Sequence, residues 1–449
     1  MLRLECAIQT YDWGKPGLES AVAQLKQEGD DHFEVQQDTR YAELWMGTHP
    51  SGPSTVIGPA GFKKIPLKDY LDAHPKATGS ASVAGGDLPF MFKVLSIAKA
   101  LSIQAHPDKC RAEALHATRP QVYKDANHKP EMAISLTPFE ALCGFRPLAE
   151  LLAHFSSFPE FKALVDDDLV TALAMVAKGS GKEVEAKEAL RKVFSSYMEA
   201  PEERAMAELS ALVARLERKQ EIERDAGEAH DPLESLILRL EAHYPGDRGV
   251  LCPLFLNYVR MGPGRAFVME ANEPHAYLSG DILECMACSD NVVRVGLTPK
   301  YRDVPTLLEM LTCASGAMAV TEGEVLAKQE GQEHRLFSPG ASIPEFEVET
   351  IKLEKTIGGC SAPFAWKGVD GPSLLVVLEG AGEAEEVRGS TGRLSVRWKT
   401  ELSERALSLH KGQVFLVPAN TGLALTSSRT SQRLYVALAH ANFHGCPAV

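Results

Sequence analysis

LSIQAHPDK, the segment Leu101–Lys109, shows a regular alternation of apolar and polar residues up to His106. A period of two is typical of a β-strand, whose successive side chains point to opposite faces. One face of the predicted strand is apolar, and the other carries the hydroxyl of Ser102, the amide of Gln104 and the imidazole of His106. Two interpretations remain open at this point: a half-exposed strand, or a strand whose polar face lines a cleft and holds a ligand.

The length and composition indicate a multidomain protein of the ordinary soluble kind. A chain of 449 residues is too long for one hydrophobic core, so we expect two or three domains. No apolar run is long enough to cross a membrane, and the first residues lack the apolar core of a secretory signal. Nine scattered cysteines indicate reduced thiols and a cytoplasmic location. The net charge of −13 argues against a nucleic-acid partner.

Strand and helix signals divide the chain into three parts. Strands are predicted at Phe90–Val94 and Glu131–Leu136, and strand signals resume after residue 250. Between them, apolar residues recur at helical spacings, and Asp231-Pro232 predicts a helix start, with an N-cap aspartate and a proline at the first helical position. The sequence therefore predicts a mainly β protein with an α-helical insertion. The expected domains are a catalytic domain over 1–147 plus 250–325, a helical inserted domain over 148–249, and a C-terminal β domain over 326–449.

A short internal repeat links the early and late β regions. Gly264–His275 aligns with Gly412–Leu423, because Gly, Phe and Ala-Asn recur at the same spacing. Two copies predict two related β-barrels. Leu423 stands where the first copy has His275, and a leucine cannot coordinate a metal. We therefore expect the C-terminal domain to be metal-free.

Four residues of the first β region are candidate metal ligands. Gln104 and His106 share one strand face, Glu131 lies on the polar side of another predicted strand, and His275 follows a proline at a turn. Two imidazoles and a carboxylate are a usual transition-metal set. The rival site is a CxxC at Cys285–Cys288, but it has no second CxxC, so ordinary packing is favoured there.

Several long motifs resemble type I mannose-6-phosphate isomerases, also called phosphomannose isomerases. They are LSIQAHPDK, NHKPEMAISLTPFEALCGFRP at Asn127–Pro147, PHAYLSGDILECMACSDNVVRVGLTPKYRDVPTLLEML at Pro274–Leu311, and the N-terminal YDWG and ELWMGTHPSGPS. The resemblance covers the whole chain, more loosely in the helical insertion and the last third. It implies cupin (jelly-roll) β-barrels and an aldose–ketose isomerase that interconverts mannose 6-phosphate and fructose 6-phosphate and supplies GDP-mannose synthesis.

The resemblance also implies one Zn²⁺ per chain, held by the same four candidate ligands, Gln104, His106, Glu131 and His275. Two neutral imidazoles, a neutral amide and one carboxylate would leave a net charge near +1. Such an ion remains a good Lewis acid for a reaction that passes through a cis-enediol(ate).

The sugar phosphate requires cations and a proton carrier. Arg294 and Lys300 flank the motif VGLTP and would grip the phosphate, with help from the hydroxyl of Ser102; without the motif, both would be read as surface charges. The resemblance suggests further catalytic or substrate-binding residues but no single agreed base. These candidates are Lys129, Glu284, His128 and Asp290 for catalysis, together with Arg294, and Tyr277 and Lys93 for lining the cleft. We favour Glu284 as the base, with Lys129 holding a substrate oxygen.

Two other functions share parts of this pattern. A cupin dioxygenase also uses two histidines and a carboxylate, to hold Fe(II). A non-catalytic sugar-binding protein with two cupin domains would keep the ligands but have no use for Lys129 and Glu284. For all three functions we expect a small-molecule partner and no membrane, and we expect a monomer.

Overall fold

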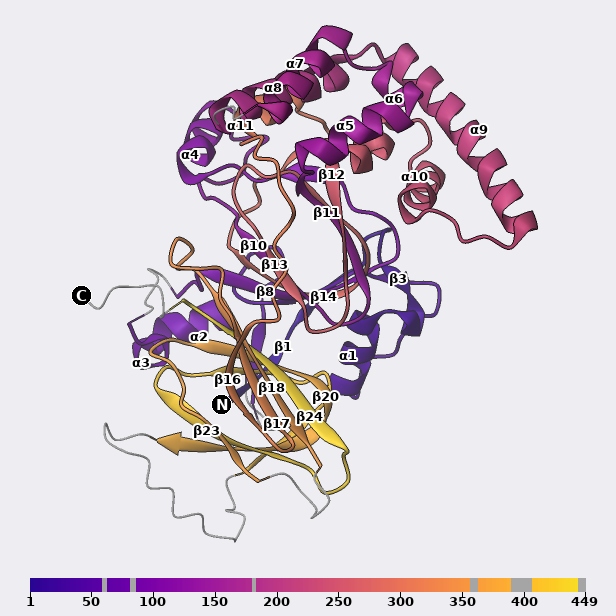
Figure 1. Ribbon diagram of the computed structural model, residues 1–449. Coiled ribbons are helices and arrows are strands. Elements are labelled where there is room, and N and C mark those ends of the chain that lie inside the picture. Colours follow the sequence, from indigo (N-terminus) through magenta and orange to yellow (C-terminus); the bar gives the residue numbers. More distant parts are fainter. Residues whose placement is uncertain (59–62, 81–85, 180–182, 356–361, 389–405, 443–449) are drawn as a thin grey trace.

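The structure, a computed structural model, describes the chain except for residues 59–62, 81–85, 180–182, 356–361, 389–405 and 443–449. Strands form the body of the molecule, and a group of helices covers one end of it, at the top of Figure 1. The C-terminal strands, orange and yellow, lie at the opposite end. The prediction of a mainly β protein with an α-helical insertion is confirmed.

One sheet carries the candidate site and has ten strands within the described ranges. Its main path runs through β12 (Leu256–Met261), β11 (Phe139–Phe145), β14 (His275–Ala287), β8 (Phe90–Ile97), β5 (Glu43–Met46) and β2 (Ala7–Gln9). The others are β9 (Ile103–Ala105), β10 (Glu131–Ser135), β13 (Ala266–Met269) and β15 (Val293–Gly296). The long strand β14 pairs antiparallel with β8, β9, β10 and β11. It therefore brings segments from distant parts of the sequence to one place.

The second sheet has twelve strands in the part of the chain that the structure describes. Its main path runs through β16 (Glu324–Gln329), β17 (Gln332–Phe337), β18 (Glu347–Glu354), β24 (Arg433–His440), β20 (Ser373–Arg388), β22 (Val414–Val417), β1 (Leu2–Glu5), β6 (Thr55–Ile57) and β7 (Ile65–Pro66). Off this path are β19 (Phe364–Trp366), β21 (Leu407–His410) and β23 (Thr421–Ser427). A separate pair is formed by β3 (Lys15–Pro16) and β4 (Arg40–Tyr41).

The barrels that the sequence predicted do not close. The first sheet ends at β12 and β2, and the second at β16 and β7, so both are open sheets. The second sheet is extended by β1, β6 and β7, which pair with β22 or with one another although their residues come from the N-terminal segment. The division into three domains therefore stays a proposal, and in space the N-terminal strands are shared between the two sheets.

Strand β8 shows how the sheet separates a core from a cavity. Phe90, Phe92 and Val94 pack into an apolar core together with residues of the second sheet. The intervening residues Met91 and Lys93 face the other way and line a cavity. Both faces are buried, so this strand lacks the simple apolar-in, polar-out pattern of a surface sheet.

The helical region follows the sequence prediction. Its helices are α5 (Leu148–Ser157), α6 (Pro159–Lys162), α7 (Asp167–Lys178), α8 (Glu183–Glu199), α9 (Glu202–Ala226) and α10 (Pro232–His243). The side chain of Asp231 caps α10 by accepting hydrogen bonds from the amides of Leu233 and Glu234, at 2.8 and 3.0 Å. These helices pack on the 3₁₀ helix η2 (Arg248–Leu254), which leads back into the sheet.

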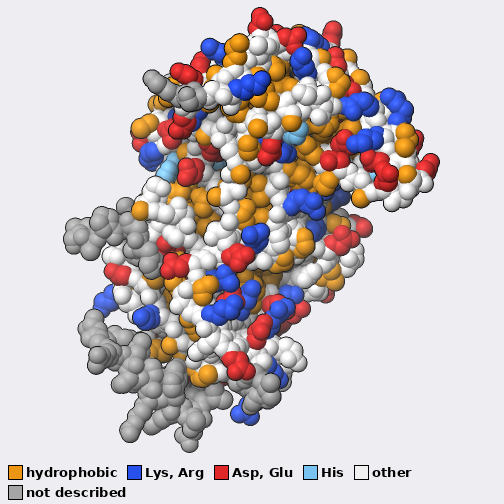
Figure 2. Space-filling model, in the orientation of Figure 1, with side chains coloured by type: hydrophobic (Ala, Val, Ile, Leu, Met, Phe, Trp, Pro, Cys, Tyr) orange, Lys and Arg blue, Asp and Glu red, His pale blue; other side chains and the backbone are white. Residues whose placement is uncertain are grey.

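Further helices surround the strands: η1 (Gly17–Glu19), α1 (Ala21–Gly29), α2 (Leu67–Ala73), α3 (Pro75–Thr78), α4 (Lys109–Thr118) and α11 (Val304–Met310). None of the described helices is both long and apolar enough to cross a membrane. On the face drawn in Figure 2, acidic and basic side chains are interspersed, and hydrophobic side chains reach the surface between the helical end and the opposite end.

The backbone supports the internal repeat. Gly264 and Gly412 both have a φ of 81°, and Asn272 and Asn420 have φ values of 64° and 58°. This left-handed region favours glycine and, among other residues, asparagine. Each asparagine therefore ends a tight turn in the same way, just before β14 in one copy and β23 in the other. In the second copy Leu423 is fully buried in an apolar core.

Candidate metal and substrate site

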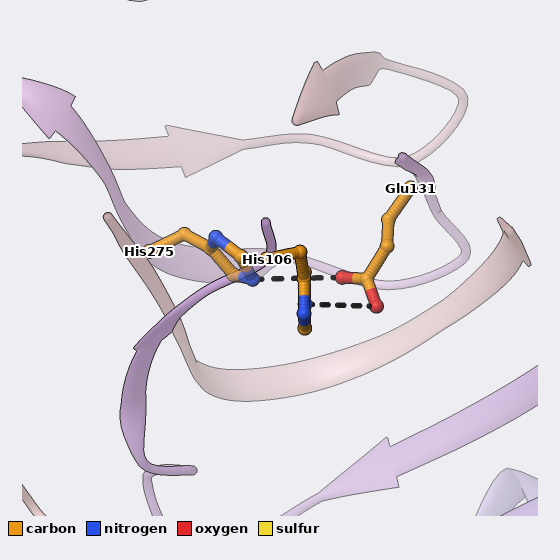
Figure 3. Close-up of side chains that lie close together, drawn as sticks. All are labelled: His106, Glu131 and His275. Carbon is orange, nitrogen blue, oxygen red and sulfur yellow. Dashed lines mark ion pairs between the residues drawn. The ribbon is translucent and has the colours of Figure 1, made fainter. Parts of the chain in front are cut away.

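Three predicted ligands meet at one point inside the first sheet. Figure 3 shows the side chains of His106, Glu131 and His275 pointing toward one another. His106 directly follows β9, and the other two are the first residues of β10 and β14. The Nε2 atom of His106 lies 3.3 Å from Oε1 of Glu131, and that of His275 lies 3.5 Å from Oε2. All three side chains are almost completely buried.

The hydrogen bonds of the two imidazoles orient them for a metal. The Nδ1 atom of His106 lies 2.7 Å from the carbonyl oxygen of Asn291, and that of His275 lies 3.0 Å from the carbonyl oxygen of Glu273. A carbonyl can only accept, so each Nδ1 carries the proton and each Nε2 presents its lone pair. Metal-binding histidines are usually held in this way.

The atoms that converge have no hydrogen-bond partner among the described residues. They are Nε2 of both histidines and Oε2 of Glu131. Burying polar atoms without partners is costly, and such atoms are rare in folded proteins. The three donors lie within 4.8 Å of one another, so one cation would satisfy all of them. The residues therefore fit a bound metal ion.

The charges of this group suit a divalent cation. Burial lowers the pKa of His106 to about 4, so its imidazole is neutral at working pH. Burial alone would raise the pKa of Glu131, but Lys129 and the two histidines hold it well below its ordinary value. The donor set therefore contains the neutral imidazole of His106, the Nε2 atom of His275 and one carboxylate.

Gln104, the fourth predicted ligand, lies beside this group. In the strand ladders it is the cross-strand partner of His275 on one side and of Arg294 on the other. Directly opposed residues have their side chains on the same face of a sheet. Gln104 and Glu131 both line the adjoining cavity.

That cavity has a volume of about 830 Å³ and contains most of the predicted site. The predicted residues on its wall are Lys93, Ser102, Gln104, Lys129, Glu131, Tyr277, Glu284, Asp290, Arg294 and Lys300. Ser102 and Gln104, on the polar face of LSIQAH, are half-buried and line this cavity, as the second interpretation predicted. The apolar residues of that strand, Ile103 and Ala105, are buried in the core.

Two carboxylate–lysine pairs stand next to the ligands. Nζ of Lys129 lies 3.2 Å from Oε1 of Glu131. Nζ of Lys93 lies 3.0 Å from Oε2 of Glu284 and 3.5 Å from Oε2 of Glu43. Burial would lower the pKa of Lys93, but Glu284 and Glu43 raise it above its ordinary value, so the amine stays charged. Burial raises the pKa of Glu284, and Lys93 opposes that rise.

The cavity also contains two basic side chains, Arg294 and Lys300. Burial lowers the pKa of Arg294, and burial together with Arg294 lowers that of Lys300. Within the described part of the chain, no carboxylate forms an ion pair with either side chain. Two cations without an ion-pair partner among the described residues form a favourable place for an anionic group, and Ser102 adds a hydroxyl to the same cavity.

Two of the proposed catalytic residues have other surroundings than expected. His128 is not part of the cavity wall; its Nε2 lies 2.5 Å from Oε1 of Glu345. It is one residue away from Lys129, and neighbouring residues in a segment that leads into a strand project to different sides. Asp290 does line the cavity, and its Oδ1 lies 3.4 Å from Nε2 of His49.

The sequence interpretation missed several residues of the wall. Glu43 accepts a hydrogen bond from the indole of Trp45, at 2.5 Å, and both residues face the cavity from β5. Their spacing of two was a readable signal. No such signal marked Tyr244 and Asp247, which follow the last helix of the insertion and also line the cavity. The region that offered no chemistry in the sequence therefore contributes to the site.

The cysteine pair has the role that the sequence favoured. Cys285 is buried in the apolar core, and the thiol of Cys288 donates to the carbonyl of Leu88 at 3.5 Å. Burial raises the pKa of both thiols. Over the described residues, the group of His106, Glu131 and His275 is the one set of three or more such side chains placed to share an ion.

Comparisons with known proteins agree along the whole chain. Residues 1–148 match the family model for the catalytic domain of type I phosphomannose isomerase, and residues 164–256 match that for its helical insertion domain. Mannose-6-phosphate isomerase 1 of Arabidopsis thaliana is 40% identical, over 98% of this chain and 94% of its own length. The human mannose-6-phosphate isomerase is 37% identical, over 94% of each chain.

Solved structures show the same likeness. A variant of phosphomannose isomerase from Salmonella typhimurium superimposes with a TM-score of 0.74 at 27% identity, covering 99% of this chain and all of the other. A mannose 6-phosphate isomerase bound with zinc and yttrium has the same TM-score and identity.

Proposed function

This chain belongs to the type I phosphomannose isomerases, and from that premise we propose that it interconverts D-mannose 6-phosphate and D-fructose 6-phosphate as a zinc-dependent isomerase. Its metabolic role would be to supply mannose 6-phosphate for GDP-mannose synthesis. We further propose that it acts as a monomer. We also propose that it acts in the cytoplasm, since its described cysteines are free thiols.

The observation that carries the proposal is one cavity that lies beside a metal-ligand group and also contains two basic side chains. Buried donor atoms of His106, Glu131 and His275 converge without partners, and Glu131 reaches the cavity wall. On the same wall, Arg294 and Lys300 have no ion-pair partner among the described residues. An open-chain hexose phosphate has a carbonyl at one end and a phosphate at the other, so its chemistry matches both. This match, with the family membership, favours the isomerase over the dioxygenase and the sugar-binding protein.

The metal-ligand group would hold one Zn²⁺ through Gln104, His106, Glu131 and His275. When bound, zinc supplies a Lewis acid that lowers the cost of negative charge on the C1 and C2 oxygens of the sugar. The protein fixes the ligand geometry: the carbonyls of Asn291 and Glu273 hold the two imidazoles.

The two basic side chains would bind the phosphate. The guanidinium of Arg294 can donate two parallel hydrogen bonds to phosphate oxygens, and the ammonium of Lys300 adds a point charge. Arg294 on β15 is the cross-strand partner of Gln104 on β9, and this pairing would hold the phosphate-binding residue at a set distance from the metal ligand.

Proton transfer falls to the carboxylate–lysine pairs. Ionised Glu284 would take the proton from C2 of mannose 6-phosphate, giving a cis-enediol(ate), and return it to C1 on the same face, while the hydroxyl proton of O2 passes to O1. A carboxyl group whose pKa is raised by burial is a stronger base than a free one. Lys129, held by Glu131, would donate a hydrogen bond to a substrate oxygen. Charged Lys93 would keep Glu284 ionised and oriented.

The test is a coupled assay that follows fructose 6-phosphate formed from mannose 6-phosphate. We expect activity that a chelator removes and added Zn²⁺ restores, with one zinc per chain by elemental analysis. No turnover by the folded, zinc-loaded protein would overturn the proposal. Light scattering of the same sample checks the expected monomer.

A further inference from the structure

Asp247 stands where the insertion returns to the sheet, and its carboxylate holds a loop of the site. Oδ1 accepts from the amide of Leu297 at 3.1 Å, and Oδ2 accepts from the amide of Thr298 at 3.4 Å. Oδ2 also accepts from Nη2 of Arg302 at 3.0 Å. On its own side, Oδ1 accepts from the amide of Gly249 at 2.7 Å. The side chain is 6% exposed.

The loop that Asp247 holds runs from Arg294 to Asp303. Its base is closed by the amide of Asp303, which donates to the carbonyl of Arg294 at 2.9 Å. Within it, the amide of Lys300 donates to the hydroxyl oxygen of Thr298 at 3.1 Å. Both proposed phosphate-binding cations are therefore on the segment that the carboxylate fixes.

The backbone there adopts a conformation that needs such support. Leu297 has a φ of 51°, which is unfavourable for a leucine. The loop also packs closely against η2, and neither Gly249 nor Gly296 has room for a side chain. A Cβ on Gly249 would lie 2.7 Å from the amide nitrogen of Leu297. A Cβ on Gly296 would lie 2.8 Å from Cα of Gly249. The surrounding contacts must impose this shape, and Asp247 bonds to the strained residue itself.

A buried carboxylate is otherwise unexpected at this place. Asp247 lines the same cavity as Arg294 and Lys300, and a negative charge there opposes the binding of an anion. Attraction of an anion alone would not favour an acidic residue at this position. The hydrogen bonds that Asp247 accepts from the loop explain why a carboxylate is present.

The insertion also contacts a second chain segment that leads to the cavity. The hydroxyl of Tyr244 donates to the carbonyl of Ala100 at 2.6 Å, and Nζ of Lys99 lies 4.3 Å from the centre of its ring. This segment leads directly to Ser102. The exit of the helical insertion, Tyr244–Gly249, thus contacts the chain segments that carry Ser102, Arg294 and Lys300.

We propose that Asp247 is a positioning residue for the phosphate subsite, through which the helical insertion sets the substrate affinity of the enzyme. It acts through Lys300 and Arg294 and does not touch the substrate. The inference rests on the proposed function, in that these two cations bind the phosphate of the sugar. It assigns to the insertion a part in substrate recognition.

The experiment measures kcat and KM for mannose 6-phosphate in the zinc-loaded Asp247→Ala and Asp247→Asn variants. We expect KM to rise by about tenfold in Asp247→Ala, and kcat to change much less. Asp247→Asn should show a smaller rise, since its Oδ1 still accepts from Leu297. Inhibition by inorganic phosphate should weaken in parallel. If removal of the negative charge were the main effect, KM would fall in both variants, and the proposal would be overturned.

Two controls separate positioning from general damage. Asp231→Ala removes the matching N-cap of α10, which also accepts from two amides, at a site outside the cavity; it should leave KM unchanged. In the Asp247→Ala/Lys300→Ala double variant, the rise in KM should be smaller than the product of the two single rises, because part of the effect of Asp247 passes through Lys300. Additive losses would show a merely structural role and would overturn the inference. A wild-type protein without activity would instead refute the proposed function.

Discussion

Glu284 and Lys93 are direct cross-strand partners of β14 and β8, and their side chains form a buried ion pair with a distance of 3.0 Å. The two residues are 191 positions apart in the sequence. Their pairing places the proposed base beside a permanent positive charge. Glu43 and Trp45 on the next strand complete the surroundings of that charge, through the ion pair with Lys93 and the hydrogen bond between them.

This pair predicts a shift in the pH profile of Lys93→Met. The ammonium of Lys93 lowers the pKa of Glu284 against the effect of burial, so its removal should raise that pKa. A base must be ionised, and the acidic limb of kcat should therefore move to higher pH, with lower activity at neutral pH. The matched control is Lys15→Met, which removes a lysine bound to Asp281 of the same strand, outside the cavity. If the acidic limb of kcat does not move in Lys93→Met, the assignment of Glu284 as the base is contradicted.

The metal site predicts linked losses of zinc, activity and stability. Zinc bound to the native state alone raises the melting temperature by mass action, and its removal leaves buried donor atoms unsatisfied. Chelation should therefore lower Tm as well as activity. His275→Ala should hold no stoichiometric zinc, and its Tm should no longer respond to added zinc. The control is His116→Ala. His116 lies on helix α4, and its imidazole forms a hydrogen bond with the carbonyl of Tyr123, so this variant should keep the wild-type response. Full activity of metal-free His275→Ala would contradict the proposed metal site.

A second buried carboxylate predicts acid sensitivity of the C-terminal sheet. Glu349 on β18 contacts the imidazole of His334, and it accepts from His440 and from the indole of Trp366 at 2.9 and 3.0 Å. Burial would raise its pKa, but the hydrogen bonds of the two histidines lower it to about 2. The folded pKa lies below the ordinary value of 4.5. The stabilisation is thus complete above that value and is lost as the pH falls toward 2.

The measurement is urea unfolding as a function of pH. At neutral pH, Glu349→Gln should reduce the free energy of unfolding by about 3 kcal/mol. The variant should also lose part of the wild-type decline between pH 4.5 and pH 2. Glu354→Gln, at the exposed end of the same strand, is the control and should behave like the wild type. Equal acid sensitivity of all three proteins would show that Glu349 is not the group responsible.

Substrate specificity is tested by Arg294→Ala. Charge-assisted hydrogen bonds to a dianion are strong, so kcat/KM for mannose 6-phosphate should fall by about 3 kcal/mol, more than a hundredfold. The slow use of free mannose should change much less, because that sugar has no phosphate. Arg111→Ala, which breaks an ion pair with Glu309 outside the cavity, is the control. Equal losses on both sugars would mean that Arg294 acts at the reacting carbons.

The sequence was informative wherever a local pattern carries the geometry. The period of two in LSIQAH was enough to place Ser102 and Gln104 on one wall, and the repeat was visible because turns need glycine and asparagine at fixed places. The pairing of Glu284 with Lys93 was not predictable, because it depends on the register between two distant strands. The same holds for Asp247, which acts only after the helical insertion has packed on the sheet.

The closed barrels were wrong for a related reason. Strand patterns predict which residues face a core, but they do not say which strand forms an edge. Here β1 and β6 join the second sheet, so the sheets stay open. His128 shows that closeness in the sequence does not place a side chain in the site. It is the neighbour of Lys129 in the chain, but its imidazole contacts Glu345.

The identity of the base can be decided by solvent-deuterium exchange. A carbon acid as weak as C2 of the sugar needs a positioned base, and two groups of the cavity can serve, Glu284 and Lys129. Nζ of Lys129 lies 3.2 Å from Oε1 of Glu131, whereas Oε2 of Glu284 lies 3.0 Å from Nζ of Lys93, which lowers the pKa of Glu284 against the effect of burial. Because a carboxylate can accept a proton and the lysine can donate a hydrogen bond, the arrangement favours Glu284 as the base and Lys129 as the donor to a substrate oxygen.

Turnover in D₂O with Glu284→Gln and Lys129→Met, each confirmed to hold zinc, separates these roles. Glu284→Gln should lose both isomerisation and deuterium uptake at carbon, because no group removes the proton. Lys129→Met should isomerise slowly but still exchange label, because proton removal at C2 continues when only the oxygen contact is lost. The reverse pattern would make Lys129 the base. If both variants exchange at the wild-type rate, Asp290 is the remaining candidate on the cavity wall, since His128 is directed to Glu345.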